Sequence, residues 1–131
     1  MGKTEFLAEI AEEYLFSGLV AHDPSKVPLA PNAVRTENGR NTGQGADDIG
    51  EKLKAWYMRM ITGIRNLRWF IIGDQEAIAF FELDTTRSPD PTLIAERFRV
   101  VDGLITEIEA IFHIPENSRP LSEMQAELDV D

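Results

Sequence analysis

The chain has 131 residues, which fits one domain at a typical domain size of about 100–200 residues. Its 23 acidic residues outnumber its 13 lysines and arginines, so the formal net charge is −10. Nucleic acids and anionic membranes are bound through cationic surfaces, so this charge argues against both as partners. The sequence contains no cysteine, which excludes disulfides, a cysteine nucleophile and thiolate metal ligands. We therefore expect an acidic, soluble, globular protein.

The first apolar segment, residues 5–21, predicts an amphipathic helix, because its apolar residues recur at three-to-four spacing. Glu9, Glu12 and Glu13 within it argue against a secretory signal or a membrane-spanning helix, so the expected location is cytoplasmic. Asp23-Pro24 follows as an N-cap and first residue of a short helical turn. The proline-containing residues 29–32 predict a loop.

The next part of the chain predicts a hairpin and a second helix. Residues 33–37 are a candidate strand, and Asn38-Gly39 is a strong turn signal after it. Residues 47–60 predict a long helix, whose buried face includes Trp56.

From residue 63 onward the hydrophobic pattern becomes that of strands. The predicted strands are residues 63–72, 77–86, 92–101 and 104–114. Turns are expected at Gly73-Asp74, at residues 87–91 and at Asp102-Gly103. Helices followed by sequential antiparallel strands make an α+β arrangement. Residues 115–131, with five acids and one base, form an acidic C-terminal tail beyond the predicted domain of residues 1–114.

Motifs for nucleotides, metals and serine hydrolysis are not found. The sequence has no P-loop, no Gly-x-Gly-x-x-Gly, no His-Glu-x-x-His and no Gly-x-Ser-x-Gly. Its two histidines lie far apart in the chain. We therefore predict neither a metal ion nor an organic cofactor.

Two stretches carry a family resemblance. The first is Asn-Ala-Val-Arg-Thr-Glu-Asn-Gly, residues 32–39, followed by Gly45 and a helix. The second, residues 96–112, has an aromatic–basic strand, an Asp-Gly turn, an isoleucine and an acid. Together they resemble the NTF2-like, or SnoaL-like, superfamily over about residues 5–114. The resemblance implies an NTF2-like (cystatin-like) cone, in which a curved antiparallel sheet wraps around N-terminal helices and encloses one internal pocket.

The pairing register of the last hairpin determines which of its residues face that pocket. A three-residue turn at residues 101–103 pairs Val100 with Leu104, and cross-strand partners share a face. The nearly apolar face, which we place inside, consists of Ile94, Glu96, Phe98, Val100, Leu104, Thr106, Ile108, Ala110 and Phe112. Glu96 is its single carboxyl group, and burial would raise the pKa of that group. A register different by one residue pairs Glu96 with Glu109, and we prefer the first register.

Three candidate catalytic residues follow. The resemblance places Glu96 near the ketosteroid isomerase strand position whose acid helps to hold the oxyanion, and Tyr14 near that enzyme's tyrosine donor. The position of the catalytic base falls on Thr36, and threonine cannot abstract a carbon-bound proton. Asp84, which shares a strand face with Glu82, is a further candidate base. Structural roles stay open for all three: a buried arginine partner for Glu96, a core position for Tyr14 and a solvated face for Asp84.

The expected ligand contacts are Thr36, Trp56, Phe98, Ile108 and Phe112. The opposite, outer face of the last two strands mixes apolar residues, among them Ile111, with charged ones. A fully solvated face would be polar throughout, so this mixture predicts a homodimer that forms through the outer sheet face.

Two function classes remain. The first is a small cofactor-independent enzyme of isomerase, dehydratase (lyase) or cyclase type, which acts by acid–base chemistry on a hydrophobic small molecule. The alternative is a non-catalytic small-molecule-binding or structural homodimer. The buried acid Glu96 favours the first class, and the missing base at Thr36 favours the second.

Overall fold

The computed structural model describes residues 3–113, with side chains from Phe6 onward. The elements are, in chain order, α1 (Lys3–Glu12), η1 (Glu13–Val20), η2 (Pro24–Lys26), β1 (Leu29–Glu37), β2 (Arg40–Gln44), α2 (Ala46–Leu53), η3 (Met58–Met60), β3 (Ile61–Ile72), β4 (Glu76–Thr85), β5 (Ser88–Val101) and β6 (Leu104–His113). The predicted C-terminal tail, residues 115–131, lies outside the described residues.

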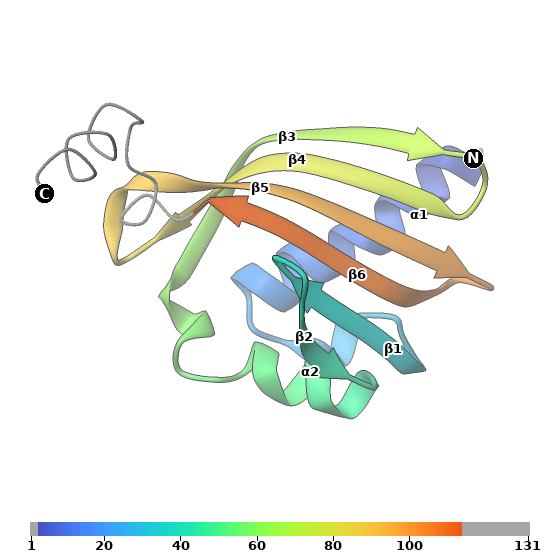
Figure 1. The fold of residues 1–131 in the computed structure, drawn as a ribbon, viewed down its shortest axis with the longest axis horizontal. Helices are drawn as coiled ribbons and strands as arrows, with labels where there is room; N and C mark the ends of the chain where they lie inside the picture. Colours follow the sequence, from blue (N-terminus) through green and yellow to red (C-terminus); the bar gives the residue numbers. More distant parts are fainter. Residues whose placement is uncertain (1–2, 114–131) are drawn as a thin grey trace, which may run out of the picture.

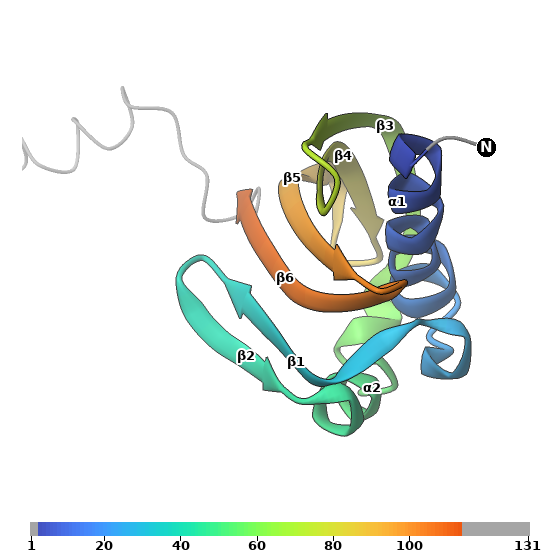
Figure 2. The same ribbon diagram turned by 90° about the vertical axis from the view of Figure 1, so that its right-hand side faces the viewer.

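Six strands form a single curved sheet in the order β2-β1-β6-β5-β4-β3 (Figure 1). Strands β3 to β6 are antiparallel neighbours joined in sequence, and β1 and β2 are also antiparallel. The pairing of β1 with β6 is parallel, which the sequence did not indicate. Helix α1 and its continuation η1 lie along the concave side of the sheet (Figure 2). The predicted α+β class is confirmed.

The N-terminal helix changes its winding half-way. The predicted helix over residues 5–21 is observed over residues 3–20, but from Glu13 it is a π-helix. The Ala21 amide donates to the carbonyl of Phe16, five residues earlier, at 2.9 Å. A π-helical turn holds more residues than an α-helical one and is common at functional sites. The change of winding begins one residue before Tyr14, which points toward the sheet with Leu15.

Both predicted Asn-Gly and Asp-Gly turns are present. Asn38 and Gly39 have φ values of +49° and +82°, and Asp102 and Gly103 have +54° and +78°. Two successive left-handed residues make the type I′ turn, whose twist matches that of the flanking strands. Each hairpin loop therefore contains two residues.

The two-residue loop corrects the predicted register of the last hairpin. Val101 faces Leu104 and Val100 faces Ile105, so Ile105 is buried and Leu104 is 38% exposed. Thr106 is then an extra residue in β6, because the register shifts by one between Arg99 and Val100. A β-bulge of this kind reverses the alternation beyond it. The predicted inner positions Leu104 and Thr106 were wrong, and the register on which the prediction rested holds nowhere.

Beyond the bulge the predicted inner face is nevertheless correct. Phe98 faces Ile108 and Glu96 faces Ala110, and all four residues are buried. The wrong turn and the unforeseen bulge compensate each other, because each moves the pairing by one residue. Glu96 therefore lies on the concave face, whereas Glu109 pairs with Arg97 on the other side.

The second helix is shorter than predicted. It ends at Leu53, and the chain continues in turns in which the amides of Lys54 and Ala55 bond carbonyls three residues earlier. This change of winding leaves Trp56 73% exposed and buries Met58 instead. Apolar spacing alone does not distinguish an α-helix from a run of such turns, so the predicted end at residue 60 was wrong.

The loops predicted from proline over residues 29–32 and 87–91 are largely strand. β1 begins at Leu29, and Pro31 lies where the pairing with β6 is interrupted between Leu29 and Val34. β5 begins at Ser88, next to another irregularity in its pairing with β4. Proline lacks an amide hydrogen, and a strand tolerates it where the ladder is broken.

The core fills the space between the helices and the concave face of the sheet. Phe98 lies at its centre, with its ring centroid 5.6 Å from that of Tyr14 and 6.0 Å from that of Trp69. The Trp69 indole Nε1 donates to Glu12 Oε1 at 2.8 Å, which ties β3 to α1. This packing holds Tyr14 against the sheet at the edge of an open space.

Candidate functional site

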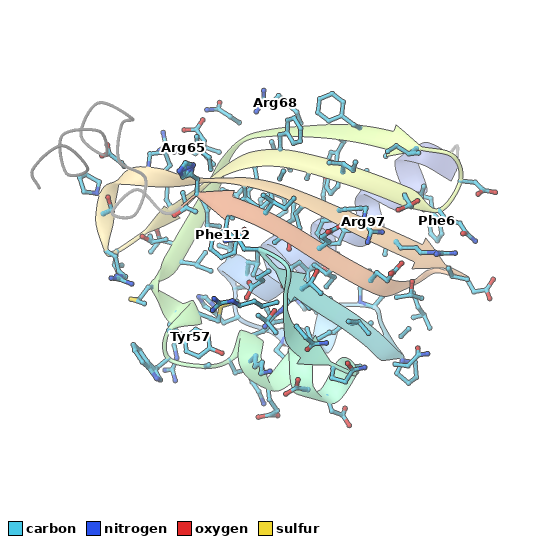
Figure 3. The ribbon with its side chains drawn as sticks, in the orientation of Figure 1. Phe6, Tyr57, Arg65, Arg68, Arg97 and Phe112 are labelled. Atoms are coloured by element: carbon cyan, nitrogen blue, oxygen red, sulfur yellow. The ribbon has the colours of Figure 1, made fainter. Side chains whose placement is uncertain are left out.

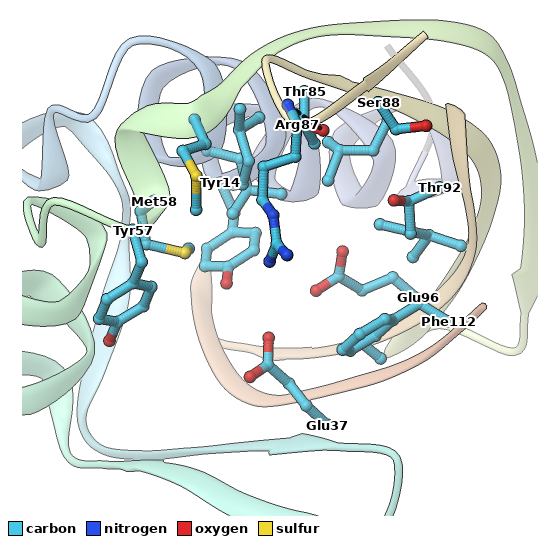
Figure 4. Close-up of a pocket in the computed structure, with 16 residues that line it drawn as sticks. Tyr14, Glu37, Tyr57, Met58, Thr85, Arg87, Ser88, Thr92, Glu96 and Phe112 are labelled. Atoms are coloured by element: carbon cyan, nitrogen blue, oxygen red, sulfur yellow. Dashed lines mark hydrogen bonds between the residues drawn. The ribbon is translucent and has the colours of Figure 1, made fainter. Parts of the chain in front are cut away.

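A cavity of about 310 Å³ opens between the concave face of the sheet, η1 and the segment around η3 (Figure 4). Ligand cavities usually measure about 300–1,000 Å³, so this one suits a small molecule. Its apolar wall consists of Leu19, Met58, Met60, Ile61, Leu83, Ile94, Ala110 and Phe112. Its polar groups are Tyr14, Glu37, Tyr57, Thr85, Arg87, Ser88, Thr92 and Glu96.

Glu96 is an acid in a mainly apolar cavity wall. It lies in β5 between Ala79 of β4 and Ala110 of β6, and it is only 3% exposed. Its two small neighbours leave room beside the carboxyl group. The pKa of Glu96 is raised to about 8, first because burial penalises the carboxylate and second because the Glu37 charge is near, while Arg35 acts in the opposite direction. At neutral pH Glu96 is therefore mainly protonated and can donate a hydrogen bond.

Tyr14 presents a hydroxyl to the same cavity. It is 1% exposed, and its Oη accepts a hydrogen bond from Arg35 Nη1 at 3.2 Å. A hydroxyl that accepts one bond still has its own proton to donate. Burial raises the pKa of Tyr14 above its usual range, although the Arg35 charge opposes the rise. Tyr14 therefore stays neutral and serves as a second donor.

Arg35 is the buried hydrogen-bond partner of the Tyr14 hydroxyl. Its guanidinium is buried, and it donates from Nε to Thr42 Oγ1 at 3.1 Å and from Nη2 to the Thr42 carbonyl at 3.0 Å. Burial lowers the pKa of Arg35, but the nearby Tyr14, Glu37 and Glu96 outweigh it and raise the pKa overall. A permanent positive charge therefore lies directly behind the tyrosine hydroxyl.

Glu37 is the second acid of the cavity. It is the last residue of β1, faces Ala110 of β6 and lines the cavity with partial exposure. Its carboxyl group and that of Glu96 point into the same space from neighbouring parts of the sheet (Figure 4). A negative charge on Glu37 favours the proton on Glu96, so the pair holds one base and one acid.

Three of the predicted site residues line this cavity: Tyr14, Glu96 and Phe112. Phe98 and Ile108 lie on the predicted face but are fully buried in the core and are not among the lining residues. They support the wall and are not in position to contact a ligand.

Thr36, Trp56 and Asp84 are elsewhere, so these three predictions are corrected. Trp56 is mostly exposed because α2 ends before it. Asp84 lies outside the lining and forms an ion pair with Arg65, Nη2 to Oδ1 at 2.8 Å, so it is not a candidate base for the cavity. Arg35 and Glu37, at the end of β1, turn inward: Arg35 is buried and Glu37 lines the cavity. Thr36 lies between them in the strand, so its side chain points to the opposite face.

Glu37 and Arg35 are the functional residues that sequence reasoning missed. The catalytic-base position was assigned to Thr36, one residue before Glu37. Successive side chains of a strand point to opposite faces, so an error of one residue exchanges the inner and the outer set. The signal was present as the alternation Arg35, Thr36, Glu37, but only the pairing with β6 shows which of them turn inward.

The opposite face of the sheet carries compensated charges. Arg97 contacts Glu76 at 2.8 Å, Glu109 at 2.9 Å and Glu107 at 3.7 Å (its side chain is labelled in Figure 3). The predicted cross-strand pair of Arg97 with Glu107 is thus one part of a larger network. These charges have partners across the strands, in contrast to the acids of the cavity.

A family described as "Domain of unknown function (DUF8021)" matches residues 3–112. The chain belongs to this family. No curated protein matches the sequence of this DUF8021 member.

Solved structures show which fold the DUF8021 chain shares. A steroid delta-isomerase from Pseudomonas aeruginosa is 21% identical, with a TM-score of 0.64, covering 94% of this chain and 91% of the other. An uncharacterized protein with a cystatin-like fold from Silicibacter pomeroyi is 16% identical, with a TM-score of 0.65 and coverage of 95% and 88%. An NTF2-like protein of unknown function from Cytophaga hutchinsonii is 10% identical, with a TM-score of 0.63 and coverage of 86% and 91%. The fold is therefore NTF2-like, as the sequence resemblance implied, and these low identities establish the fold alone.

Two further observations concern the described part of the chain. Within residues 3–113, no three histidine, aspartate or glutamate side chains lie together where they could hold a metal ion. In the same residues, no helix is long and apolar enough to cross a membrane.

Proposed function

We propose that the chain is a small enzyme that moves a proton within a hydrophobic carbonyl compound, without a cofactor, in an isomerase-type reaction. One observation carries the proposal: a protonated carboxyl, Glu96, and a second acid, Glu37, point into one mainly apolar cavity that also holds the Tyr14 hydroxyl. Acid–base catalysis requires one group that accepts a proton and another that donates one at the same pH, and different environments of two acids can provide both.

In the proposed reaction, the Glu37 carboxylate removes a proton from a carbon next to the carbonyl group. The electron pair of that C–H bond moves into the carbonyl, which becomes an enolate oxygen. Glu96 and Tyr14 donate hydrogen bonds to this oxygen and stabilise its charge. Glu37 then returns the proton to another carbon of the conjugated system, so that the double bond moves and every group regains its starting state.

The fold comparison supports this proposal. The solved neighbours include a steroid delta-isomerase, whose name describes the movement of a double bond. The same donors would also serve a dehydratase or a cyclase, because these reactions too pass through a developing negative charge on oxygen. The base at Glu37 specifically favours proton transfer at carbon.

The proposal can be tested with cyclohex-3-en-1-one in D₂O at pH 7, followed by NMR. We expect catalysed exchange of the hydrogens next to the carbonyl and formation of the conjugated ketone. Glu37→Gln should lower the catalysed rate by about 10²–10⁴-fold, the usual contribution of general acid–base catalysis. Glu109→Gln, on the opposite sheet face, is the matched control and should leave the rate unchanged.

The pH dependence adds an independent test. Glu96 donates only while protonated, so the catalysed rate should fall as the pH rises through about 8. Equal rates for the wild-type protein and Glu37→Gln would overturn the assignment of the base. A ketone that binds in the cavity without any catalysed exchange would favour the alternative, a non-catalytic small-molecule-binding protein.

We also propose a homodimer that forms through the outer sheet face. The support is a group of exposed apolar side chains on the outer side of β3 to β6: Phe70, Phe80, Leu93 and Ile111. Ile111 is 61% exposed and Leu93 57%, and a shallow depression lined by both lies beside Phe80 and Arg68. Contiguous exposed apolar surface of this kind is typical of protein interfaces.

A further inference from the structure

Arg87 is a cavity residue that the proposed proton transfer does not use. It follows β4 in the short turn before β5, and its side chain lines the cavity. In the close-up of the cavity its guanidinium group extends inward, into the space between Tyr14 and Glu96 (Figure 4).

The turn that carries Arg87 is held in place by hydrogen bonds that its backbone amides donate. The Arg87 amide donates to Thr85 Oγ1 at 3.3 Å. The amide of Thr86 donates to the carbonyl of Met60 at 2.8 Å, which joins the turn to the neighbouring η3 segment. The base of the Arg87 side chain therefore has a defined position at the cavity entrance.

Three hydroxyl groups lie on the same side of the cavity. Thr85 and Ser88 flank Arg87 in the chain, and Thr92 follows on β5. Figure 4 shows Ser88 and Thr92 on the wall next to Arg87. Hydroxyl donors beside a planar guanidinium are suited to the two oxygens of a carboxylate, which arginine binds through paired N–H groups.

Arg87 gives the cavity a cationic group that an anionic ligand could contact. Among its lining residues Arg87 is the cation, Glu37 the anion and Glu96 an acid that is protonated at neutral pH. The whole chain has a formal net charge of −10, which repels anions at a distance. A local guanidinium at the entrance is the feature that would allow a small anion to enter such a protein.

We propose that the ligand of this cavity carries a carboxylate that pairs with Arg87, while its carbonyl oxygen reaches Glu96 and Tyr14. This inference rests on the proposed function only in taking the cavity as the ligand site. The substrate class is then a small keto acid with an apolar body rather than a neutral hydrophobic ketone. Arg87 determines specificity, and Glu37, Glu96 and Tyr14 carry the chemistry.

The test compares matched pairs of probes that differ only in charge. Phenylacetate and 2-phenylethanol, 3-phenylpropanoate and 3-phenylpropanol, and 4-phenylbutanoate and 4-phenylbutanol are titrated at pH 6.5, with binding measured by NMR shifts. We expect the best carboxylate to bind at least tenfold more tightly than its alcohol, and this preference should weaken as salt is added.

Three variants test whether the preference for carboxylates over alcohols depends on Arg87. Arg87→Gln should abolish it by weakening the carboxylate alone, and Arg87→Lys should retain part of it, because lysine keeps the charge but not the paired N–H groups. Arg68→Gln is the matched control, since it removes an exposed arginine whose guanidinium lies over the Phe80 ring on the outer face. It should leave the preference unchanged.

The outcomes separate this inference from the proposed function. The inference is overturned if no carboxylate binds at millimolar concentration, if the wild-type protein shows no preference, or if the preference survives Arg87→Gln. A charge preference that depends on Arg87, with no proton exchange for any ketone, would support the inference and contradict the proposed function. Proton exchange that depends on Glu37, together with equal binding of carboxylates and alcohols, would support the proposed function and contradict the inference.

Discussion

Glu96 and Arg97 are neighbours in the chain, yet they lie on opposite faces of the sheet and experience opposite environments. Arg97, on the outer face, has three carboxylates within 3.7 Å. Glu96, on the inner face, pairs across the sheet with two alanines and is almost fully buried. On the outer face the charges form a network of ion pairs, whereas the inner face isolates an acid and raises its pKa to about 8.

This contrast explains where chemistry is possible. A charge with several partners is held in one protonation state over the whole physiological range. A buried carboxyl without such a partner changes its state near neutral pH, which is the range in which a proton donor is useful. The alternation of a single strand therefore places a structural network and a candidate acid side by side.

The largest expected effect comes from the apolar residues of the two faces. Phe98→Ala should lower the free energy of unfolding by about 3–5 kcal/mol, because it leaves a void between Tyr14 and Trp69 in the core. Phe80→Ala, on the outer face and 40% exposed, should cost about 1 kcal/mol or less. Urea unfolding followed by circular dichroism measures both, and equal losses would contradict the assignment of the faces.

The second effect is the pH dependence of stability that Glu96 imposes. Its folded-state pKa of about 8 lies above the ordinary value of 4.5, so the folded protein binds this proton more tightly than the unfolded chain. The contribution is therefore most favourable below pH 4.5 and is lost as the pH rises from 4.5 to 8. At about 1.4 kcal/mol per pKa unit, the contribution of Glu96 to the free energy of unfolding falls by about 3 kcal/mol between pH 4.5 and pH 7.

Glu96→Gln should remove this dependence, and Glu109→Gln should not. Both variants are compared with the wild-type protein by urea unfolding at a series of pH values between 4.5 and 8.5. The difference between wild type and Glu96→Gln should change steadily with pH across that window. A difference that is independent of pH would show that Glu96 does not have a raised pKa.

The third effect concerns the outer face as an interface. Ile111→Lys should weaken the proposed homodimer at least tenfold, about 1.4 kcal/mol, because it places a charge among exposed apolar side chains. Light scattering coupled to size-exclusion chromatography measures the molar mass over a dilution series. Lys26→Ala, a change outside the sheet, serves as the control, and a wild-type protein that is monomeric at high concentration would refute the dimer.

The smallest expected effect is that of the outer ion-pair network. Arg97→Gln should lower the free energy of unfolding by about 0.5–1 kcal/mol, because partly exposed ion pairs contribute little. The loss should shrink at high salt, which screens such pairs. A loss of several kcal/mol, measured by urea unfolding with and without 0.5 M NaCl, would show that these charges are more desolvated than the structure indicates.

Much of the fold could be predicted from local patterns. The Asn38-Gly39 and Asp102-Gly103 turns are recognisable because few other residue pairs adopt two successive left-handed conformations. The strands from residue 61 to residue 113 follow from alternation, and Glu96 stood out as one carboxyl on an apolar face. Helix ends were less predictable: residues 54–60 have helical spacing but form tighter turns.

The candidate site was predictable in part, for a related reason. Glu96 was found as the single acid on an apolar strand face, and Phe112 as an inward position of the same hairpin. Tyr14 was found from the family resemblance and its place on the inner face of the first helix. All three line the cavity. Glu37 and Arg35 were missed, because their positions in the cavity depend on how separate elements meet. Thr36 and Asp84 were assigned to the site for the same reason, and the structure places them on other surfaces.

The sequence by itself determined the α+β class, the hairpin turns and the presence of an isolated acid in an apolar strand, since these depend on neighbours within a few residues. The tertiary structure alone decided which acid accompanies Glu96. The parallel pairing of β1 with β6 turns Glu37 inward, and the bulge at Thr106 keeps Glu96 on the same side. Because a shift of one residue in either pairing would exchange the faces, long-range register decides what the cavity can do.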